Sequence, residues 1–229
     1  MKGLALPRLL RRLPHSLGFG IAGILLLAML LLAGLRVRSP GLRPTTHPRV
    51  ARHAPWVFGR PDARFTLIEY ADLECPYCRA YFPVLERWIE EHPQVNWEWW
   101  NLPLMMHDPA ASREAVLAEC VGEADGNKAF WRATAWIYRH TRGDGAGVPA
   151  DTRMPGIGAT MRACLKTGKA QAVIRAQARE ASLINVVGTP TLRILDNQTG
   201  RTLELQGPVA GDSLLSAIDS LAATGSQHQ

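Results

Sequence analysis

Two cysteines separated by two residues are the part of this sequence with the most definite chemistry. Cys75-Pro76-Tyr77-Cys78 follows an apolar run at 65–70 and precedes a segment able to form a helix. Such a pair closes into a small disulfide or opens to a reactive dithiol, and the N–H groups at a helix N-terminus favour the Cys75 thiolate. The motif therefore predicts redox chemistry. The alternative is half of a zinc site, which needs a second ligand pair; Cys120 and Cys164 stand alone and do not supply one.

The charge of the chain is unevenly distributed. The formal net charge is +6, but residues 1–60 hold ten Lys or Arg and no Asp or Glu. Residues 61–229 keep 16 basic and 20 acidic residues, a net charge of −4. A nucleic-acid-binding domain would carry a basic excess, so we exclude nucleic acid as a partner. The length of 229 residues suits one globular domain with accessory segments.

The N-terminal segment has the composition of a membrane anchor. A basic stretch at 1–15 precedes an apolar segment at 16–35, whose 20 residues match one bilayer crossing. A secretory signal peptide has a shorter apolar region and a small-x-small cleavage site, whereas this run ends in Ala33-Gly34-Leu35-Arg36. We favour an uncleaved transmembrane signal anchor, with 1–15 in the cytoplasm, and keep a removed signal peptide as the alternative.

Charge alone does not orient this anchor, because Lys and Arg flank the apolar segment on both sides. Four cysteines that include a C-x-x-C suit an oxidising compartment. We therefore expect a single-pass protein of the inner (cytoplasmic) membrane, with its body in the periplasm or another extracytoplasmic space. Residues 36–58, rich in Pro and Arg, are interpreted as a linker, and 224–229 as a tail.

The order of predicted elements within 59–223 indicates an α/β domain. Periodicity predicts strand, helix and strand at 65–70, 79–91 and 95–99, with Pro83 kinking the helix. A helical insertion at about 104–185 follows, with helices at 109–122, 128–140, 157–166 and 170–183 and an exposed, mobile loop at 142–151. The last elements are two strands joined by a turn and a helix, at 191–195, 202–205 and 212–223. A right-handed crossover makes the first two strands parallel, and the short turn makes the last two antiparallel. This is the plan of a thioredoxin-like domain with inserted helices.

Three segments of the chain stand in the order of a known family. They are Phe65-Thr-Leu-Ile-Glu-Tyr-Ala-Asp-Leu-Glu-Cys-Pro-Tyr-Cys, Asn101-Leu-Pro-Leu and Val187-Gly-Thr-Pro-Thr. With them, residues 57–223 resemble the DsbA family of thiol–disulfide oxidoreductases, in the branch with a CPYC active site. A C-x-x-C followed by Gly-Thr-Pro before a strand is a specific combination.

The resemblance implies a role for each matching residue. Cys75 matches the exposed nucleophile that forms a mixed disulfide with a client protein, and Cys78 the more buried resolving cysteine. Pro190 matches a cis-proline that lies against the active-site disulfide, with the backbone of Thr189 pairing with the client. Glu69 matches a buried acid that assists proton transfer. Two alternatives stay open, namely that Pro190 only begins a strand and that Glu69 points to solvent.

Tyr77 departs from the best-known oxidases of the family, which carry histidine at that position. Tyrosine supplies no positive charge, so we expect a pKa of Cys75 above the value of about 3.5 found in DsbA, and a less oxidising couple. Pro76 and Tyr77 are thus expected to modulate the active site.

Cys120 and Cys164 fall on two predicted helices of the insertion. In an oxidising compartment we expect them to form a structural disulfide, the alternative being two separate buried thiols. His107 is interpreted as a loop residue without a role, and the tryptophans of the body as core residues.

These features predict a membrane-anchored, extracytoplasmic oxidoreductase that introduces disulfides into envelope or secreted client proteins through Cys75 and Cys78. Client proteins with free thiols are the expected partners, and the resemblance implies a membrane redox partner. We expect a monomer without cofactor or metal. The alternatives are an isomerase or reductase that uses the same cysteines, or a redox-inactive scaffold or chaperone.

Overall fold

The computed structural model of the protein describes residues 56–223. The predicted anchor at 16–35, most of the predicted linker and the tail lie outside these residues. Within 56–223, no helix is both long enough and apolar enough to cross a bilayer.

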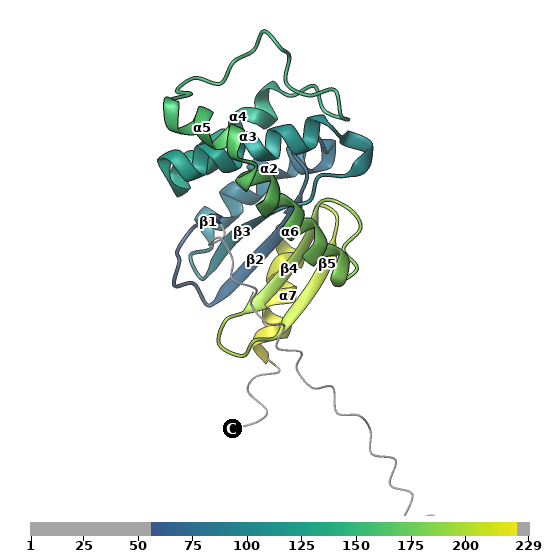
Figure 1. Ribbon diagram of the computed structural model, residues 1–229. Helices are drawn as coiled ribbons and strands as arrows, with labels where there is room; N and C mark the ends of the chain where they lie inside the picture. Colours follow the sequence, from purple (N-terminus) through teal and green to yellow (C-terminus); the bar gives the residue numbers. More distant parts are fainter. Residues whose placement is uncertain (1–55, 224–229) are drawn as a thin grey trace, which may run out of the picture. The chain divides into compact units, whose positions relative to one another are not determined.

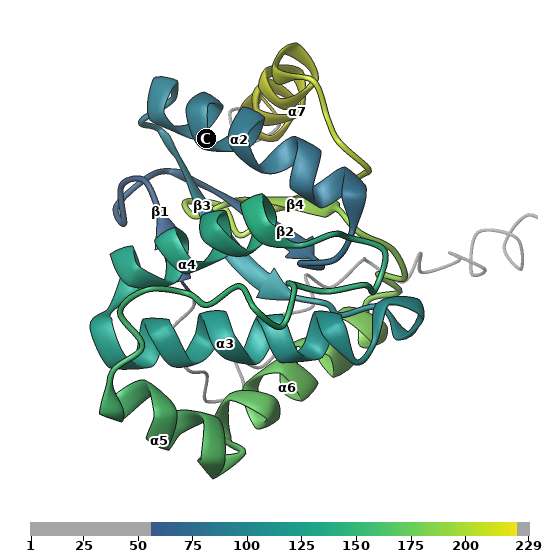
Figure 2. The ribbon, with the colours of Figure 1, turned by 90° about the horizontal axis from the view of Figure 1, so that it is seen from above.

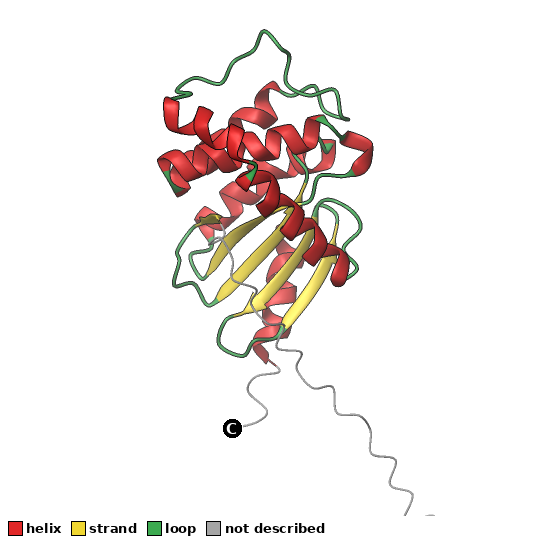
Figure 3. Ribbon diagram, in the orientation of Figure 1, coloured by secondary structure: helices red, strands yellow, loops and turns green. Residues whose placement is uncertain are grey.

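A five-stranded sheet forms the centre of the described domain (Figure 1 and Figure 3). Its strand order is β1-β3-β2-β4-β5, with the bounds Trp56–Phe58 (β1), Phe65–Ala71 (β2), Val95–Asn101 (β3), Thr191–Asp196 (β4) and Thr202–Gln206 (β5). β2 and β3 are parallel, and the other three neighbouring pairs are antiparallel. The predicted parallel pair and C-terminal hairpin are therefore both present.

β1 is the one strand that the sequence did not predict, since 36–58 was assigned to the linker. Three residues are too few to show an alternating pattern, and tertiary contacts hold this strand. Trp56 pairs with Trp99 in the sheet, its ring stacks on Phe130 at a centroid distance of 4.9 Å, and its Nε1 donates to Glu119 at 2.9 Å. The strand therefore depends on partners far away in the chain.

Helices cover both faces of the sheet (Figure 2). α2 (Pro76–Glu91) and α7 (Gly211–Ala223) lie on one face, and α6 (Lys169–Leu183) crosses the other. The other inserted helices gather beyond one end of the sheet: α3 (Ala110–Asp125), α4 (Asn127–His140) and α5 (Ala159–Thr167). A short 3-10 turn, η1 (Met105–His107), leads into them.

α2 begins three residues earlier than the predicted start at residue 79 and continues through Pro83. Pro76 occupies the first helical position, where a missing N–H costs nothing and the fixed φ suits the helix. Cys75 is consequently the N-cap residue and Cys78 lies in the first turn.

Aromatic rings fill the space between the sheet and the insertion. Trp97 and Trp99 are fully buried, and Trp97 contacts Phe82 and Trp131 at centroid distances of 5.1 and 4.5 Å. Tilted and edge-on contacts of this kind add to the free energy of burying the rings. They fix α2 and α4 against β3, next to the loops that carry the functional residues. Five of the six tryptophans from 88 to 136 are buried, and Trp136 is half-buried.

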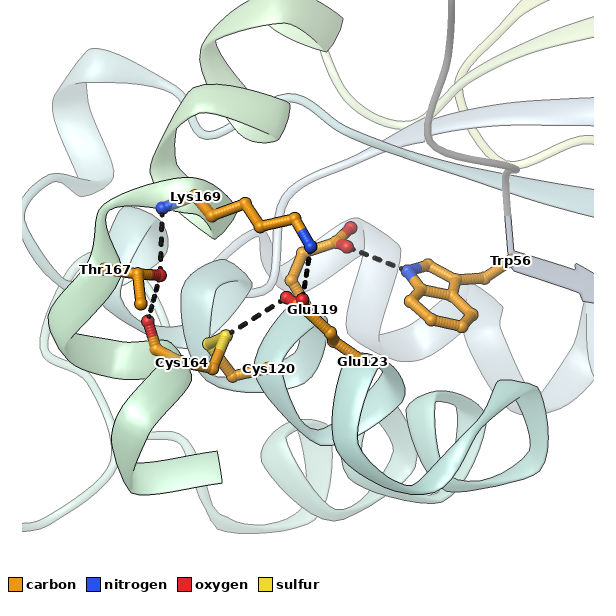
Figure 4. The surroundings of a disulfide bond; sticks show 7 residues. All are labelled: Trp56, Glu119, Cys120, Glu123, Cys164, Thr167 and Lys169. Carbon is orange, nitrogen blue, oxygen red and sulfur yellow. Dashed lines mark hydrogen bonds and ion pairs between the residues drawn. A yellow bond between two sulfur atoms is a disulfide. The ribbon is translucent and has the colours of Figure 1, made fainter. Parts of the chain in front are cut away.

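A disulfide between Cys120 and Cys164 joins α3 to α5 (Figure 4), with the two Cα atoms 5.6 Å apart. Beside it, the Glu123 carboxylate on α3 forms an ion pair with Lys169 at the start of α6. The disulfide and the ion pair together link the three helices of the outer layer.

The sequence predicted an exposed, mobile loop at 142–151, but part of this loop is buried in the structure. Gly143 and Gly147 are buried, as is Thr141 just before them. The Glu74 carboxylate accepts hydrogen bonds from the Thr141 hydroxyl and, at 2.7 Å, from the Gly147 N–H. Composition did not reveal this loop's anchorage because the carboxylate that holds it lies 67 residues before Thr141.

Candidate active site

The C-x-x-C motif lies at the carboxyl end of β2, on a segment that we call the redox turn (residues 72–78). β4 runs antiparallel to β2, with Thr191 opposite Tyr70, so the loop before β4 reaches the same end of the sheet. This topology brings Thr189 to the motif. The Cys75 Sγ lies 3.4 Å from the Thr189 carbonyl oxygen, although 114 residues separate the two. The expectation of an exposed Cys75 is wrong, because the residue is 3% exposed with its sulfur against this backbone.

Pro190 has the cis peptide bond that the resemblance implied. The Thr189–Pro190 peptide bond is cis, Pro190 is buried, and its carbonyl accepts the Gly207 N–H at 2.8 Å. β4 begins at the next residue, Thr191, so Pro190 also precedes a strand.

Cys75 and Cys78 have pKa values shifted in opposite directions. The pKa of Cys75 is lowered to about 6, chiefly by a hydrogen bond from the Cys78 thiol and further by Thr189 and two backbone N–H groups of the first helical turn, while burial opposes the shift. The pKa of Cys78 is raised well above its usual value by burial, by its hydrogen bond to Cys75 and by the charge of Glu69. Near neutral pH, Cys75 is therefore the thiolate and Cys78 the thiol.

The Cys75 pKa of about 6 lies above the value of about 3.5 of DsbA, in the direction expected from Tyr77. The Tyr77 side chain is 65% exposed and projects from the redox turn. Three other exposed apolar residues lie on the two neighbouring loops: Met105, Met106 and Val187.

Glu69 points into the protein rather than to solvent, with 1% of its surface exposed. The pKa of its carboxyl is raised to about 8, chiefly by burial; the Trp97 indole opposes this shift and the charge of Cys75 adds to it. Glu69 is thus protonated near neutral pH and close enough to both cysteines to influence their charge. In this state the carboxyl can give a proton to a nearby thiolate, and the carboxylate that results can take a proton back from a thiol.

Four polar side chains around the redox turn are buried although the sequence predicted no role for them: Asp72, Glu74, His107 and Glu114. Asp72 and Glu74 sit within a run of otherwise buried residues directly before Cys75, which was the signal available in the sequence. Glu114 is known only from the fold: burial and the neighbouring Glu74 carboxyl raise its pKa to about 9.

The described residues contain no group of three or more His, Cys, Asp or Glu side chains arranged to hold a metal ion. The site thus contains a dithiol in which the Cys75 sulfur is activated, the buried carboxyl of Glu69, and exposed apolar side chains on the neighbouring segments.

Comparison with known proteins agrees with this geometry. A family model described as Thioredoxin matches residues 52–219. The crystal structure of DsbA2 from Pseudomonas aeruginosa shares 42% sequence identity at a TM-score of 0.71, over 76% of this chain and 96% of that one. The thiol-disulfide exchange protein α-DsbA2 from Wolbachia pipientis, at 19% identity and a TM-score of 0.58, covers 73% and 87% of the two chains and shares the fold.

A shorter likeness connects the chain to curated membrane proteins. Over 84 residues it is 34% identical to the Na(+)/H(+) antiporter NhaA 3 of Salinispora tropica. The matched segment is 37% of this chain and 12% of the antiporter, so the chain spans about an eighth of that protein's length.

Proposed function

Since this chain belongs to the thioredoxin family and is a DsbA-like thiol–disulfide oxidoreductase, we propose that it introduces disulfides into client proteins through Cys75 and Cys78. We further propose that it does so outside the cytoplasm, held at the membrane by residues 16–35.

The reaction proceeds in two exchanges. A client thiolate attacks the Cys75 Sγ of the Cys75–Cys78 disulfide, and Cys78 leaves and takes up a proton. A second client thiolate then attacks the client sulfur of the mixed disulfide and expels Cys75 as a thiolate. The client has lost two electrons and gained a disulfide, and the enzyme has gained the two electrons as a thiolate and a thiol. A membrane-bound oxidant, implied by the family resemblance, takes these electrons and restores the Cys75–Cys78 disulfide.

The surrounding residues support each step. The depressed pKa of Cys75 makes it a good leaving group in the second exchange. Cys78 leaves as a poorly stabilised thiolate, and Glu69, with a pKa of about 8, is the nearby acid that can protonate it. The Thr189 backbone beside Cys75 can pair with an extended client segment. Exposed apolar side chains, with Met105 and Met106 the most adaptable, can receive the client's neighbouring residues.

The single observation that carries the proposal is the separation of the two cysteine pKa values. A thiolate stabilised in the reduced enzyme favours the reduced form, which makes the disulfide form an oxidant. A Cys75 pKa of about 6 lies between those of thioredoxin (about 7) and DsbA (about 3.5).

The test is the reduction potential, measured by equilibration with glutathione, together with oxidation of a reduced client. We expect a potential between about −270 mV, the value of thioredoxin, and about −120 mV, that of DsbA. A potential at or below that of thioredoxin would assign the chain to the reductases. A Cys78→Ala variant should hold the mixed disulfide on Cys75, and the captured proteins identify the clients.

A further inference from the structure

His107 is a buried histidine beside the redox turn that the proposed exchange does not use. It comes from η1, between β3 and α3, and its side chain is 8% exposed. Its Nδ1 lies 2.8 Å from Oδ2 of Asp72, 35 residues earlier in the chain. A carboxylate only accepts hydrogen bonds, so Nδ1 is the donor in this pair.

Asp72 connects this histidine to both cysteines. Its backbone oxygen accepts the Cys75 N–H at 3.1 Å, and its own backbone N–H partly offsets the rise in the pKa of Cys78. Its carboxylate accepts the Glu74 N–H through Oδ1 and the Leu104 N–H through Oδ2, each at 2.7 Å. The orientation of this one carboxylate therefore sets the backbone from Asp72 to Cys75.

The loop at 142–147 holds His107 in place from the outside. Gly145 packs so closely that a Cβ on it would lie 3.1 Å from the Cα of His107. The same loop is bound to the redox turn, since the Glu74 carboxylate accepts the Gly147 N–H at 2.7 Å and the Glu74 carbonyl accepts the Asp144 N–H at 2.8 Å. His107 is thus enclosed between its hydrogen bond to Asp72 and a loop fixed by Glu74.

We propose that His107 is a positioning residue for disulfide exchange, because its Nδ1–H holds the Asp72 carboxylate in the orientation that keeps Cys75 at the N-terminus of α2 and against Thr189. The inference rests on the proposed use of Cys75 as the exchanging sulfur, and not on the direction of exchange. Without this donor, Oδ2 keeps only the Leu104 N–H, and a buried carboxylate that has lost a partner reorients or takes up a proton. Reorientation releases the Glu74 N–H, and protonation weakens the hydrogen bond that the Glu74 N–H makes to Oδ1. Either change loosens the donors that stabilise the Cys75 thiolate.

Three substitutions of His107 separate a hydrogen bond from charge and size. In H107N the amide N–H can occupy the place of Nδ1–H, in H107Q it falls nearer the place of Nε2, and H107L has no donor. The readouts are the Cys75 thiolate titration, followed by ultraviolet absorbance of the reduced protein, and the equilibrium with glutathione. H92L is the matched control, since the Nδ1 of His92 bonds a backbone carbonyl, that of Trp88, at the far end of α2.

We expect H107L and H107Q to raise the Cys75 pKa by about half a unit or more, as the loss of one buried hydrogen bond would allow, and to shift the glutathione equilibrium toward the disulfide. H107N and H92L should match the unsubstituted protein. Urea unfolding confirms that the compared variants are folded, and if H107L is not, the polar pair H107N and H107Q decides.

If a folded H107Q or H107L variant kept the Cys75 pKa of the unsubstituted protein, the proposal would be overturned. An H107N variant shifted as far as H107Q would also overturn it, because the effect would then belong to the imidazole itself. The titration needs no client, so a couple too reducing for an oxidase would refute the proposed function and leave this result standing.

Discussion

At the scale of single residues, the active site separates two sulfurs that are chemically identical in the unfolded chain. Cys75 receives donors from the first turn of α2, and its sulfur lies 3.4 Å from the Thr189 carbonyl oxygen. Cys78, one turn along, is fully buried, and burial raises its pKa. The carboxyl of Glu69 adds to this difference once it is ionised, because its charge then raises the pKa of Cys78. Its own protonation is the residue-scale property most open to measurement.

Glu69→Gln should make the protein more stable at neutral pH and should slow exchange. The pKa of Glu69 is about 8 in the folded protein, against 4.5 for an unperturbed glutamate. Between these values the unfolded chain releases the proton that the folded chain keeps, so stability is full below about pH 4.5 and is lost as the pH rises toward 8. Removing the carboxyl should recover more than about 1 kcal/mol at pH 7.

The measurement is urea unfolding of the oxidised protein across this pH range, so that the thiols do not titrate. Glu204→Gln, at an exposed position on β5, is the matched control and should keep the wild-type pH profile. A wild-type profile in Glu69→Gln as well would mean that the Glu69 carboxyl is ionised in the folded state. Slower exchange is measured as the rate of client oxidation, which should fall because Cys78 loses its proton donor.

At the scale of elements, the outer layer of α3, α5 and α6 is held together differently from the sheet. α5 has only two buried residues, Met161 and Cys164, so it contributes little apolar surface to the core. The disulfide to α3 supplies a constraint that packing does not. Its stability effect and its redox role can therefore be tested apart.

Replacing both Cys120 and Cys164 by Ala should lower the free energy of unfolding by about 2–4 kcal/mol, because the cross-link closes a loop that the unfolded chain must otherwise order. The reduction potential of the Cys75–Cys78 pair should stay unchanged, since the second disulfide joins α3 to α5 and shares no residue with the redox turn. Chemical denaturation and glutathione equilibration measure the two quantities on the same sample. A changed potential would show that this disulfide communicates with the active site.

At the scale of the whole molecule, the described domain accounts for exchange chemistry, and the proposed anchor accounts for where it happens. Full-length protein should stay in the membrane fraction after an alkaline wash. A variant whose residues 1–35 are replaced by a cleavable signal peptide should be soluble outside the cytoplasm and should keep its exchange activity. If the chain expressed from the full-length sequence is instead recovered soluble and shortened, residues 16–35 are a removed signal peptide.

Much of the architecture was predictable because its signals are local. Strand alternation and helix periodicity are each read within one stretch of chain. The C-x-x-C and the Gly-Thr-Pro are far apart, but each is a short motif that can be recognised by itself. β1 was missed because it exists through Trp56's distant partners. The bond between Asp72 and His107 spans 35 residues and joins two residue types common in loops, so only the folded backbone reveals it.

The near-complete burial of both cysteines has a consequence for the timing of client folding. Cys75 is 3% exposed and its sulfur lies against Thr189, so a thiol inside a finished globular protein cannot approach it. Only a client chain that is still unfolded around its cysteines can bring a thiol to Cys75. The rate of exchange should therefore follow the lifetime of the client's unfolded state, and slow-folding clients should depend on this enzyme most.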